Sequence, residues 1–359
     1  MPATSHFLQD IYRQTSELQR AIAGLNGEGS AALSEAAVLV RESRNVFLTG
    51  IGASWNAALG AGALFSQRGR PVFLLEAGEL MHFTAIPRGS VVIAISRTGR
   101  SIEIVQLIAK IRERGASLIG ITNSPDSPLA KESTVAIVIP APLDYAISVN
   151  TYSTLAVAAA ALATFDGSDF KDSCVSLSRA LAAAEKKLDE WREQLTNSAW
   201  LAPKATCYFL ARGPSQASCY QARLLWEEGA KSPATAMNTS GFRHGPQETV
   251  VPGMRFCIWI DPAILRVQDF AVADDLKKLG ASVTLIGQKL PENSGHLLLE
   301  IPEVHPNWQF ILDVLPIQLA AERLAELSGV DCDTFRVCSY IVEDEHGLLN
   351  QKRSATDAQ

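Results

Sequence analysis

Short apolar runs alternate with longer stretches of helical spacing along the first half of the chain. The runs are rich in β-branched residues, too brief for helices and typical of strands buried on both faces; they lie at 45–49, 70–75, 91–95, 117–121 and 135–139. Helical stretches separate them, such as the one from Ile102 to Ile111, which Arg114 and Gly115 end. This alternation predicts βαβ units, and therefore a parallel sheet with helices on both faces.

The pattern restarts in the second half. The run from Cys207 to Leu210 leads into a glycine-containing turn, as Phe47 and Leu48 do earlier. The segment from Glu113 to Gly120 is likewise repeated by the one from Lys278 to Leu285, about half a chain length later. The sequence therefore predicts a duplicated α/β fold: two doubly wound domains, each with a parallel five-stranded sheet.

We predict four segments: N-terminal helices at 1–44, a first α/β domain at 45–168, a second at 169–343 and a C-terminal tail at 344–359. The N-terminal segment is expected to contain two helices, broken at Gly24–Gly29. The boundary between the two domains is placed at the loop Asp166–Asp169. After it, one charged amphipathic helix is expected to continue to about Asn197.

Composition indicates a globular protein without a nucleic acid or membrane partner. Of 359 residues, 47% are hydrophobic and 19% charged, and the net charge of −6 leaves no basic surface for nucleic acid or an anionic membrane. The longest apolar run, Thr154 to Phe165, is too short to span a bilayer, and the residues after Met1 lack a signal-peptide pattern. Six cysteines without a C-x-x-C pair are typical of reduced core thiols rather than disulfides or metal ligands. We therefore expect a cytoplasmic protein.

A serine-rich turn follows the apolar run at 91–95. Ser96, Thr98 and Ser101 surround Gly99 immediately before a predicted helix. Backbone N–H groups at a helix N-terminus bind anions without needing a lysine. An ordinary N-cap is the alternative, but one hydroxyl is enough for a cap, and three favour a phosphate site. In the second half Asp261 and Pro262 begin the corresponding turn, and an aspartate there would repel phosphate, so only the first half is expected to bind the anion.

A second glycine-containing turn, Gly50–Ser54, superficially suggests a dinucleotide-binding fingerprint. Its sixth position is Trp55, where that fingerprint has glycine or alanine, and a lone G-x-G is weak evidence. No G-x-x-x-x-G-K motif of a P-loop occurs either. We interpret Gly52 and Ser54 as a second wall of a sugar-phosphate pocket.

Two further positions suggest proton-transfer chemistry. Glu227 and Glu228 end a predicted helix, and because neighbouring residues on a helix point about 100° apart, only one is expected to face inward. His244 lies between glycines and a proline in a predicted loop, a frequent place for functional histidines. Either acid could instead be a solvated surface residue. The other histidines are scattered without H-x-x-x-H or H-x-H spacing, so no metal site is predicted.

These motifs together resemble the tandem sugar isomerase (SIS) domain family. The resemblance covers about residues 30–343 and is most specific at the serine-rich turn and at His244-Gly245-Pro246. Relatives in this family include the isomerase half of glucosamine-6-phosphate synthase and single-chain phosphosugar isomerases, deaminases and deglycases. The resemblance implies a flavodoxin-like fold for both domains and a phosphorylated sugar as the ligand.

The resemblance also implies roles for individual residues. Ser96, Thr98 and Ser101 match the family's phosphate ligands, Gly52 and Ser54 the other side of that pocket, and Ser148 a serine that contacts the substrate. Glu228 matches the glutamate that moves a proton between C1 and C2 through an enediol or enamine. His244 matches the ring-opening histidine, which the neighbouring subunit donates in the family, so a homodimer is implied. No metal or organic cofactor is expected.

The sequence departs from the family pattern at three positions. Cys338 and Leu225 stand where the synthases have lysines, and Arg97 replaces a glutamine and could contact phosphate or a carboxylated substituent. The sequence also begins directly with the SIS region, so we expect no glutaminase domain. The expected chemistry is therefore isomerisation, deamination or deglycation of a hexose or amino-sugar 6-phosphate. The alternative is a non-catalytic regulatory protein that binds a sugar phosphate.

Overall fold

The computed structural model describes residues 4–165, 169–344 and 347–348. Contacts divide the chain into two units. The first unit combines Arg20–Phe170 with Asp333–Gln359, and the second combines Met1–Gln19 with Lys171–Cys332. The predicted boundary at residue 168 falls on 166–168, outside the described residues. The grouping also differs from the predicted ranges at the ends, since residues 4–19 group with the second unit and residues 333–343 with the first.

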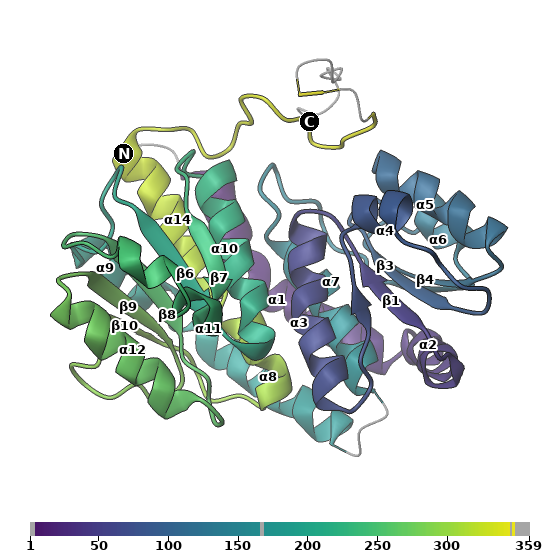
Figure 1. The fold of residues 1–359 in the computed structure, drawn as a ribbon, viewed down its shortest axis with the longest axis horizontal. Helices are drawn as coiled ribbons and strands as arrows, with labels where there is room; N and C mark the ends of the chain where they lie inside the picture. The colour runs from purple at the N-terminus through teal and green to yellow at the C-terminus, as the bar shows by residue number, and fades with distance from the viewer. Residues whose placement is uncertain (1–3, 166–168, 345–346, 349–359) are drawn as a thin grey trace. The chain divides into compact units, whose positions relative to one another are not determined.

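The first unit is a parallel sheet between two groups of helices. Its elements are α2 (Ser30–Glu42), β1 (Val46–Thr49), α3 (Ala53–Gln67), β2 (Phe73–Leu74), α4 (Ala77–Phe83), β3 (Val91–Ile95), α5 (Ile102–Glu113), β4 (Ser117–Thr122), α6 (Pro128–Glu132), β5 (Val135–Val138) and α7 (Asn150–Thr164). One core lies between the sheet and α4, α5 and α6, while α3 and α7 pack against each other on the other side (Figure 1). Every residue of the Ala-rich helix α7 is buried.

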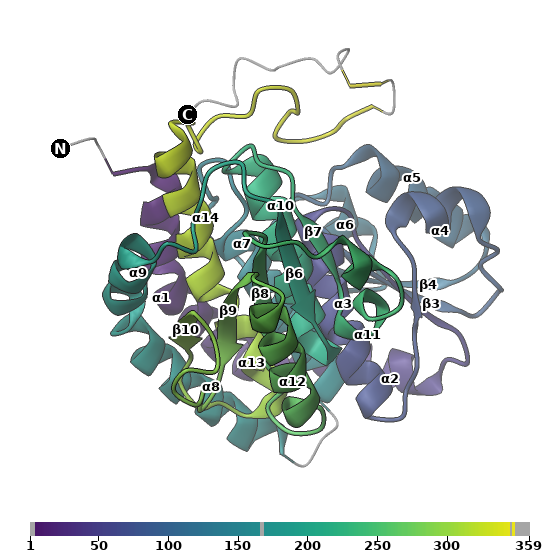
Figure 2. The same cartoon turned by 60° about the vertical axis from the view of Figure 1, so that its left-hand side comes forward.

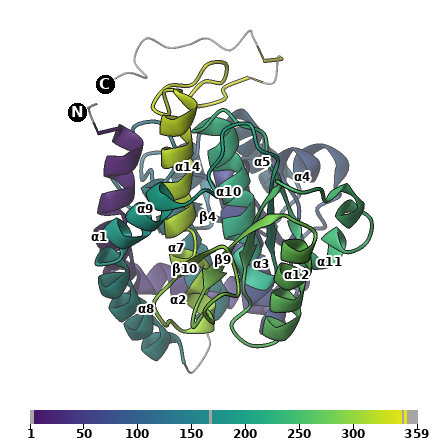
Figure 3. The ribbon, with the colours of Figure 1, turned by 90° about the vertical axis from the view of Figure 1, so that its left-hand side faces the viewer.

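The second unit repeats this architecture. Its elements are α8 (Phe170–Glu185), α9 (Leu188–Asn197), β6 (Cys207–Ala211), α10 (Gln216–Glu228), β7 (Thr235–Asn238), α11 (Thr239–Phe242), β8 (Arg255–Trp259), α12 (Arg266–Lys278), β9 (Ser282–Gly287), β10 (Leu297–Glu300), α13 (Gln309–Leu312) and α14 (Leu315–Ser328), together with the first two-thirds of α1 (His6–Asn26). Short 3-10 helices occur at Gly213–Ser215, Pro246–Thr249 and Pro306–Trp308. Figure 2 shows α12 in front of β8 and β9, and Figure 3 shows α9 beside α14.

Both sheets have the same strand order, which confirms the duplicated fold. The first runs β2-β1-β3-β4-β5 and the second β7-β6-β8-β9-β10, and all neighbouring strands are parallel. This 2-1-3-4-5 order is that of flavodoxin-like folds, whose ligands bind where the order reverses, at the carboxyl ends of the first and third strands.

The structure corrects two predicted elements. The helix expected up to Asn197 is two helices, α8 and α9, separated at Lys186 and Lys187. The buried positions Ala184, Leu188, Trp191 and Leu195 keep helical spacing across the break, so apolar periodicity does not reveal it. The strand expected at 70–75 is only Phe73–Leu74, because it lies at a sheet edge and Pro71 has no N–H to donate.

The cysteines are free thiols, and one departs from the prediction of core positions. Cys174, Cys207, Cys219, Cys257 and Cys332 are buried, and burial raises the pKa of the thiols of Cys207, Cys219 and Cys257. Cys338 is exposed. Among the described helices, none is both long and apolar enough to cross a membrane.

Candidate functional site

The serine-rich turn and the Gly50–Ser54 turn lie side by side in the first unit. Thr49 at the end of β1 pairs with Ala94 near the end of β3, so both turns leave the sheet at the same edge. One turn leads into α3 and the other into α5. Two helix N-termini therefore meet at the point where the strand order reverses, which is the ligand site of this kind of sheet.

The hydroxyl groups of the serine-rich turn shape the turn and are not used to cap the helix. Ser96 Oγ accepts a hydrogen bond from the Gly99 amide (3.1 Å), and Thr98 Oγ1 accepts one from the Arg100 amide (3.3 Å). Ser101 occupies the N-cap position of α5 but makes no side-chain capping bond within the described part of the chain. The ordinary-cap alternative is therefore not supported, because the residue in the capping position does not cap.

Glycine is required at position 99 for two reasons. Its φ is +60°, a conformation that L-residues rarely adopt. A Cβ atom there would also lie 2.5 Å from Ser127 Oγ and 2.8 Å from Leu129 Cβ. The turn is therefore packed tightly against the next loop of the sheet edge, which fixes Ser96 and Thr98 in place.

The Gly50–Ser54 turn, the predicted opposite wall of the pocket, also depends on glycines. Gly52 precedes α3 with φ +54°, and Ser54 in the first turn of that helix is buried. A Cβ on Gly50 would lie 2.7 Å from the Ser54 carbonyl carbon. The close approach of Gly50 to the helix places the first turn of α3 directly at the end of β1.

Asp144, which the sequence analysis did not single out, holds the loop that contains Ser148. Its buried carboxylate accepts bonds from the amides of Val149 (3.0 Å), Asn150 (3.0 Å) and Thr151 (2.9 Å), at the N-terminus of α7. The spacing of six residues to Asn150 is longer than in an ordinary N-cap, so local motif rules do not identify it. Asp144 is thus a positioning residue for the neighbouring Ser148.

Arg97 is bonded to protein groups in this structure. Its NH1 donates to Ser148 Oγ (3.0 Å), its NH2 donates to the Tyr340 carbonyl (2.8 Å), and its guanidinium carbon lies 3.9 Å from the centre of the Tyr340 ring. The turn, the Ser148 loop and the C-terminal segment therefore meet at one arginine.

In the second unit, the two adjacent acids differ in exposure. Glu227 is exposed and pairs with Arg223 at 3.6 Å, whereas Glu228, the last residue of α10, is half-buried. Leu225, at the position of a family lysine, is fully buried.

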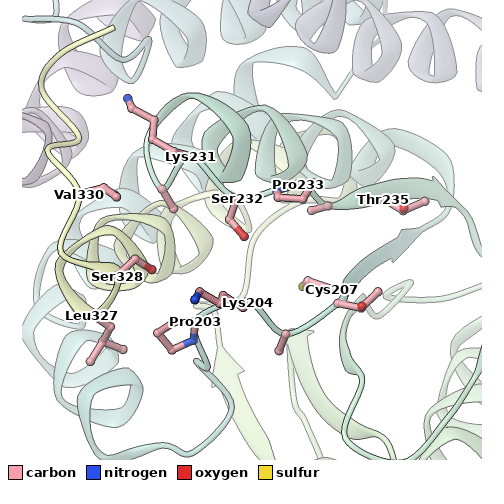
Figure 4. A pocket seen from close by; sticks show the side chains of 14 residues that line it. Pro203, Lys204, Cys207, Lys231, Ser232, Pro233, Thr235, Leu327, Ser328 and Val330 are labelled. Carbon is pink, nitrogen blue, oxygen red and sulfur yellow. The ribbon is translucent and has the colours of Figure 1, made fainter. Parts of the chain in front are cut away.

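A cavity of about 660 Å³ adjoins the end of α10 (Figure 4). It lies at the amino ends of β6 and β7 and is lined by residues from four segments: 203–207, 230–235, 327–328 and 330. Figure 4 shows Lys204 and Ser232 directed toward its middle, while the ammonium group of Lys231 points away and donates to the Glu228 carbonyl.

Glu228 lies at the amino ends of the strands of the second sheet, and His244 lies at their carboxyl ends. Glu228 precedes β7, and His244 follows the carboxyl end of that strand in an exposed loop, before Gly245 with φ +126°. A strand of four residues, 235–238, spans about 13 Å. The second unit of one chain therefore does not bring the two side chains together.

The turn of the second unit that corresponds to the serine-rich turn carries its own carboxylate. Asp261 accepts hydrogen bonds from the amides of Ala263 (3.0 Å) and Leu265 (3.0 Å). Its own amide donates to the buried Asp269, which also accepts from Arg212 Nε (2.6 Å). An internal anion thus occupies these backbone donors, which agrees with the expected loss of a phosphate site in the second copy.

Comparisons with known proteins define the class. Residues 39–164 match the SIS domain family, so this part of the chain is a SIS domain, and the resemblance drawn from the sequence is confirmed. The second unit has the same strand order, and the fold is that of two SIS-type α/β domains.

Individual relatives narrow the class. The chain is 25% identical over 341 residues to glutamine–fructose-6-phosphate aminotransferase (isomerizing) of Pyrobaculum aerophilum, covering 91% of this chain and 56% of the relative. It thus spans about half the length of the curated relatives that it matches over most of its own length. The solved C-terminal domain of the Francisella tularensis glucosamine-fructose-6-phosphate aminotransferase is similar with a TM-score of 0.83 and 20% identity, covering 92% of this chain and 98% of that one. Tagatose-6-phosphate ketose/aldose isomerase of Escherichia coli is similar with a TM-score of 0.77 and 18% identity, covering 94% and 98%. These similarities show that the chain has the same fold as these two solved structures.

Proposed function

We propose that the protein is an isomerase or deaminase of a hexose or amino-sugar 6-phosphate. The observation that carries the proposal is the turn from Ser96 to Ser101, which places three hydroxyls at a helix N-terminus where the strand order reverses. The relatives named for fructose-6-phosphate and tagatose-6-phosphate have the same fold and support a phosphorylated sugar as substrate.

In the proposed mechanism, the sugar phosphate binds at this turn, and Glu228 and His244 act on its carbonyl end. His244 moves a proton at the ring oxygen to open the sugar, because an imidazole ring carries one nitrogen that can accept a proton and one that can donate a proton. The Glu228 carboxylate then takes the C2 proton of the open aldose while the carbonyl oxygen O1 gains a proton, which gives an enediol. Return of the proton from Glu228 to C1, with loss of the proton from O2, gives the ketose. With nitrogen at C2 the intermediate is an enamine, whose imine form is hydrolysed by water to release ammonia.

We further propose that the working form is a homodimer in which His244 comes from the other subunit. The position of His244 in an exposed loop, at the opposite edge of the second sheet from Glu228, supports this arrangement. Mixing Glu228→Gln chains with His244→Ala chains should restore about one quarter of wild-type activity, because half of the dimers are mixed and each mixed dimer has one intact site. Inactive mixed dimers, isolated with two different affinity tags, would show that both residues act from one chain.

Substitution of the turn hydroxyls tests the phosphate site. Ser96→Ala combined with Thr98→Ala should weaken binding of fructose 6-phosphate about 10²–10⁴-fold, because each of the two charge-assisted hydrogen bonds contributes roughly 1.5–3 kcal/mol. Titration calorimetry with fructose 6-phosphate and with fructose measures the difference. Ser90→Ala is the matched control, since this buried serine donates to the Pro87 carbonyl before the start of β3. An equal loss of affinity for fructose and for its phosphate would contradict the assignment.

The second candidate function is a regulatory protein that binds a sugar phosphate without converting it. The burial of Leu225 favours it, since no cation takes the place of the family lysine at this position. Incubation with hexose and hexosamine 6-phosphates, followed for ketose and ammonia, separates the two: binding without either product supports the regulatory function.

A further inference from the structure

The C-terminal segment Ser339–Val342 lies against the serine-rich turn of the first unit. The Val342 carbonyl accepts a hydrogen bond from the amide of Ile102 (3.1 Å), the first residue of α5. One N–H group at the N-terminus of this helix is therefore satisfied by the C-terminal segment, and an anion at the turn has to use the remaining amides and the hydroxyl groups.

The same segment is attached at two further points. Tyr340 provides its carbonyl to Arg97 NH2 (2.8 Å) and its hydroxyl to the Asp144 carbonyl (3.2 Å). Asp144 is the residue whose carboxylate holds the loop before α7. The Tyr340 side chain therefore spans from the serine-rich turn to the loop that carries Ser148.

Arg97 uses the planar shape of its guanidinium group in these contacts. Two different nitrogens donate to Ser148 Oγ and to the Tyr340 carbonyl, and the face of the group stacks on the Tyr340 ring at 3.9 Å. All three partners are neutral. A lysine has the same charge but neither the two directed donors nor a flat face for stacking.

We propose that Arg97 and Tyr340 form a clasp that holds the segment 339–342 as a wall of the phosphate site, so that Arg97 is a positioning residue whose geometry matters more than its charge. This inference depends on the proposed function only for the identity of the ligand. It differs from the sequence-based prediction, in which Arg97 contacts phosphate directly.

Conservative substitutions separate the two roles. If Arg97 acts by charge on the ligand, Arg97→Lys should keep the affinity for fructose 6-phosphate. If it acts as a clasp, Arg97→Lys and Tyr340→Ala should each weaken this affinity about tenfold, because both remove the stacking of the guanidinium group on the Tyr340 ring that holds the segment. The double variant should then be no weaker than either single variant, because both remove the same contact.

Hydrogen exchange provides a measurement that does not depend on the ligand. In the ligand-free protein, mass spectrometry should show about tenfold faster exchange of the Ile102 amide in Arg97→Lys and Tyr340→Ala, because the Val342 carbonyl leaves it more often. Tyr340→Phe keeps the ring and the carbonyl contact and loses only the hydrogen bond from the hydroxyl to the Asp144 carbonyl, so its exchange should increase less than that of Tyr340→Ala. Val337→Ala, at an exposed position just before the segment 339–342, is the control.

Wild-type exchange at Ile102 in Arg97→Lys, or additive losses of affinity in the double variant, would overturn the clasp. Failure of the proposed function has a different signature. The wild-type protein would then not bind fructose 6-phosphate, while the exchange measurement would still show whether Arg97 holds the segment.

Discussion

Glu228→Gln is expected to lower turnover of a hexose 6-phosphate by about 10²–10⁴-fold, the usual contribution of a general base. Glutamine has nearly the same shape but cannot accept the C2 proton, so the affinity for the substrate should change little. Glu228 is half-buried at the end of α10, whereas a purely solvated acid would be exposed. Steady-state kinetics with separate kcat and KM values provide the test.

The neighbouring acid is a matched control for this variant. Glu227→Gln removes an equal charge one residue earlier, from an exposed side chain that pairs with Arg223. Its turnover should stay within about twofold of wild type, since surface ion pairs contribute little. Equal losses in both variants would indicate a general charge effect, and unchanged turnover in Glu228→Gln would remove this residue from the mechanism.

Asp313→Asn is expected to flatten the pH dependence of the stability of the second unit. Burial raises the pKa of the Asp313 carboxyl from 3.8 to about 7, against the lowering effect of hydrogen bonds such as that from Ser215 Oγ (2.7 Å). Between about pH 4 and 7 the unfolded chain therefore loses this proton while the folded chain keeps it. The wild-type free energy of unfolding should lose up to about 1.4 kcal/mol per pH unit from this group, or about 4 kcal/mol in total.

The comparison of wild type with Asp313→Asn isolates this group. Asparagine is neutral at every pH and keeps an oxygen that can accept from Ser215, so the variant should gain stability relative to wild type as the pH rises from 4 to 7. Urea unfolding followed by tryptophan fluorescence suits the measurement, because five of the six tryptophans belong to the second unit. Parallel stability curves for the two proteins across this range would show that Asp313 is already ionised in the folded state.

The sequence predicts the sheets and the serine-rich turn well because both are encoded by neighbouring residues. The strand β3, the turn after it and the helix α5 form one continuous stretch, in which apolar run, glycine and hydroxyl residues all indicate the same structure. Because apolar runs and helical stretches alternate again in the second half, the sequence also predicts that the fold is duplicated. Polar edge strands such as β7, with the sequence Thr235-Ala236-Met237-Asn238, carry no comparable pattern and were not predicted.

What the sequence does not reveal is contact between distant segments. Arg97 and Tyr340 are 243 positions apart, and the grouping of residues 333–344 with the first unit depends on such contacts. Asp144 is closer to its partners, but its role depends on a loop that folds back on the N-terminus of α7. Local sequence patterns therefore do not distinguish Arg97, Tyr340 or Asp144 from ordinary polar residues.

The structure of the protein with fructose 6-phosphate bound tests the central claim most directly. We expect the phosphate group within hydrogen-bond distance of Ser96, Thr98 and Ser101, the Glu228 carboxylate within reach of C1 and C2, and the imidazole of a partner subunit near the ring oxygen. A phosphate group bound at any other place, or a Glu228 carboxylate out of reach of both carbon atoms, would contradict the account.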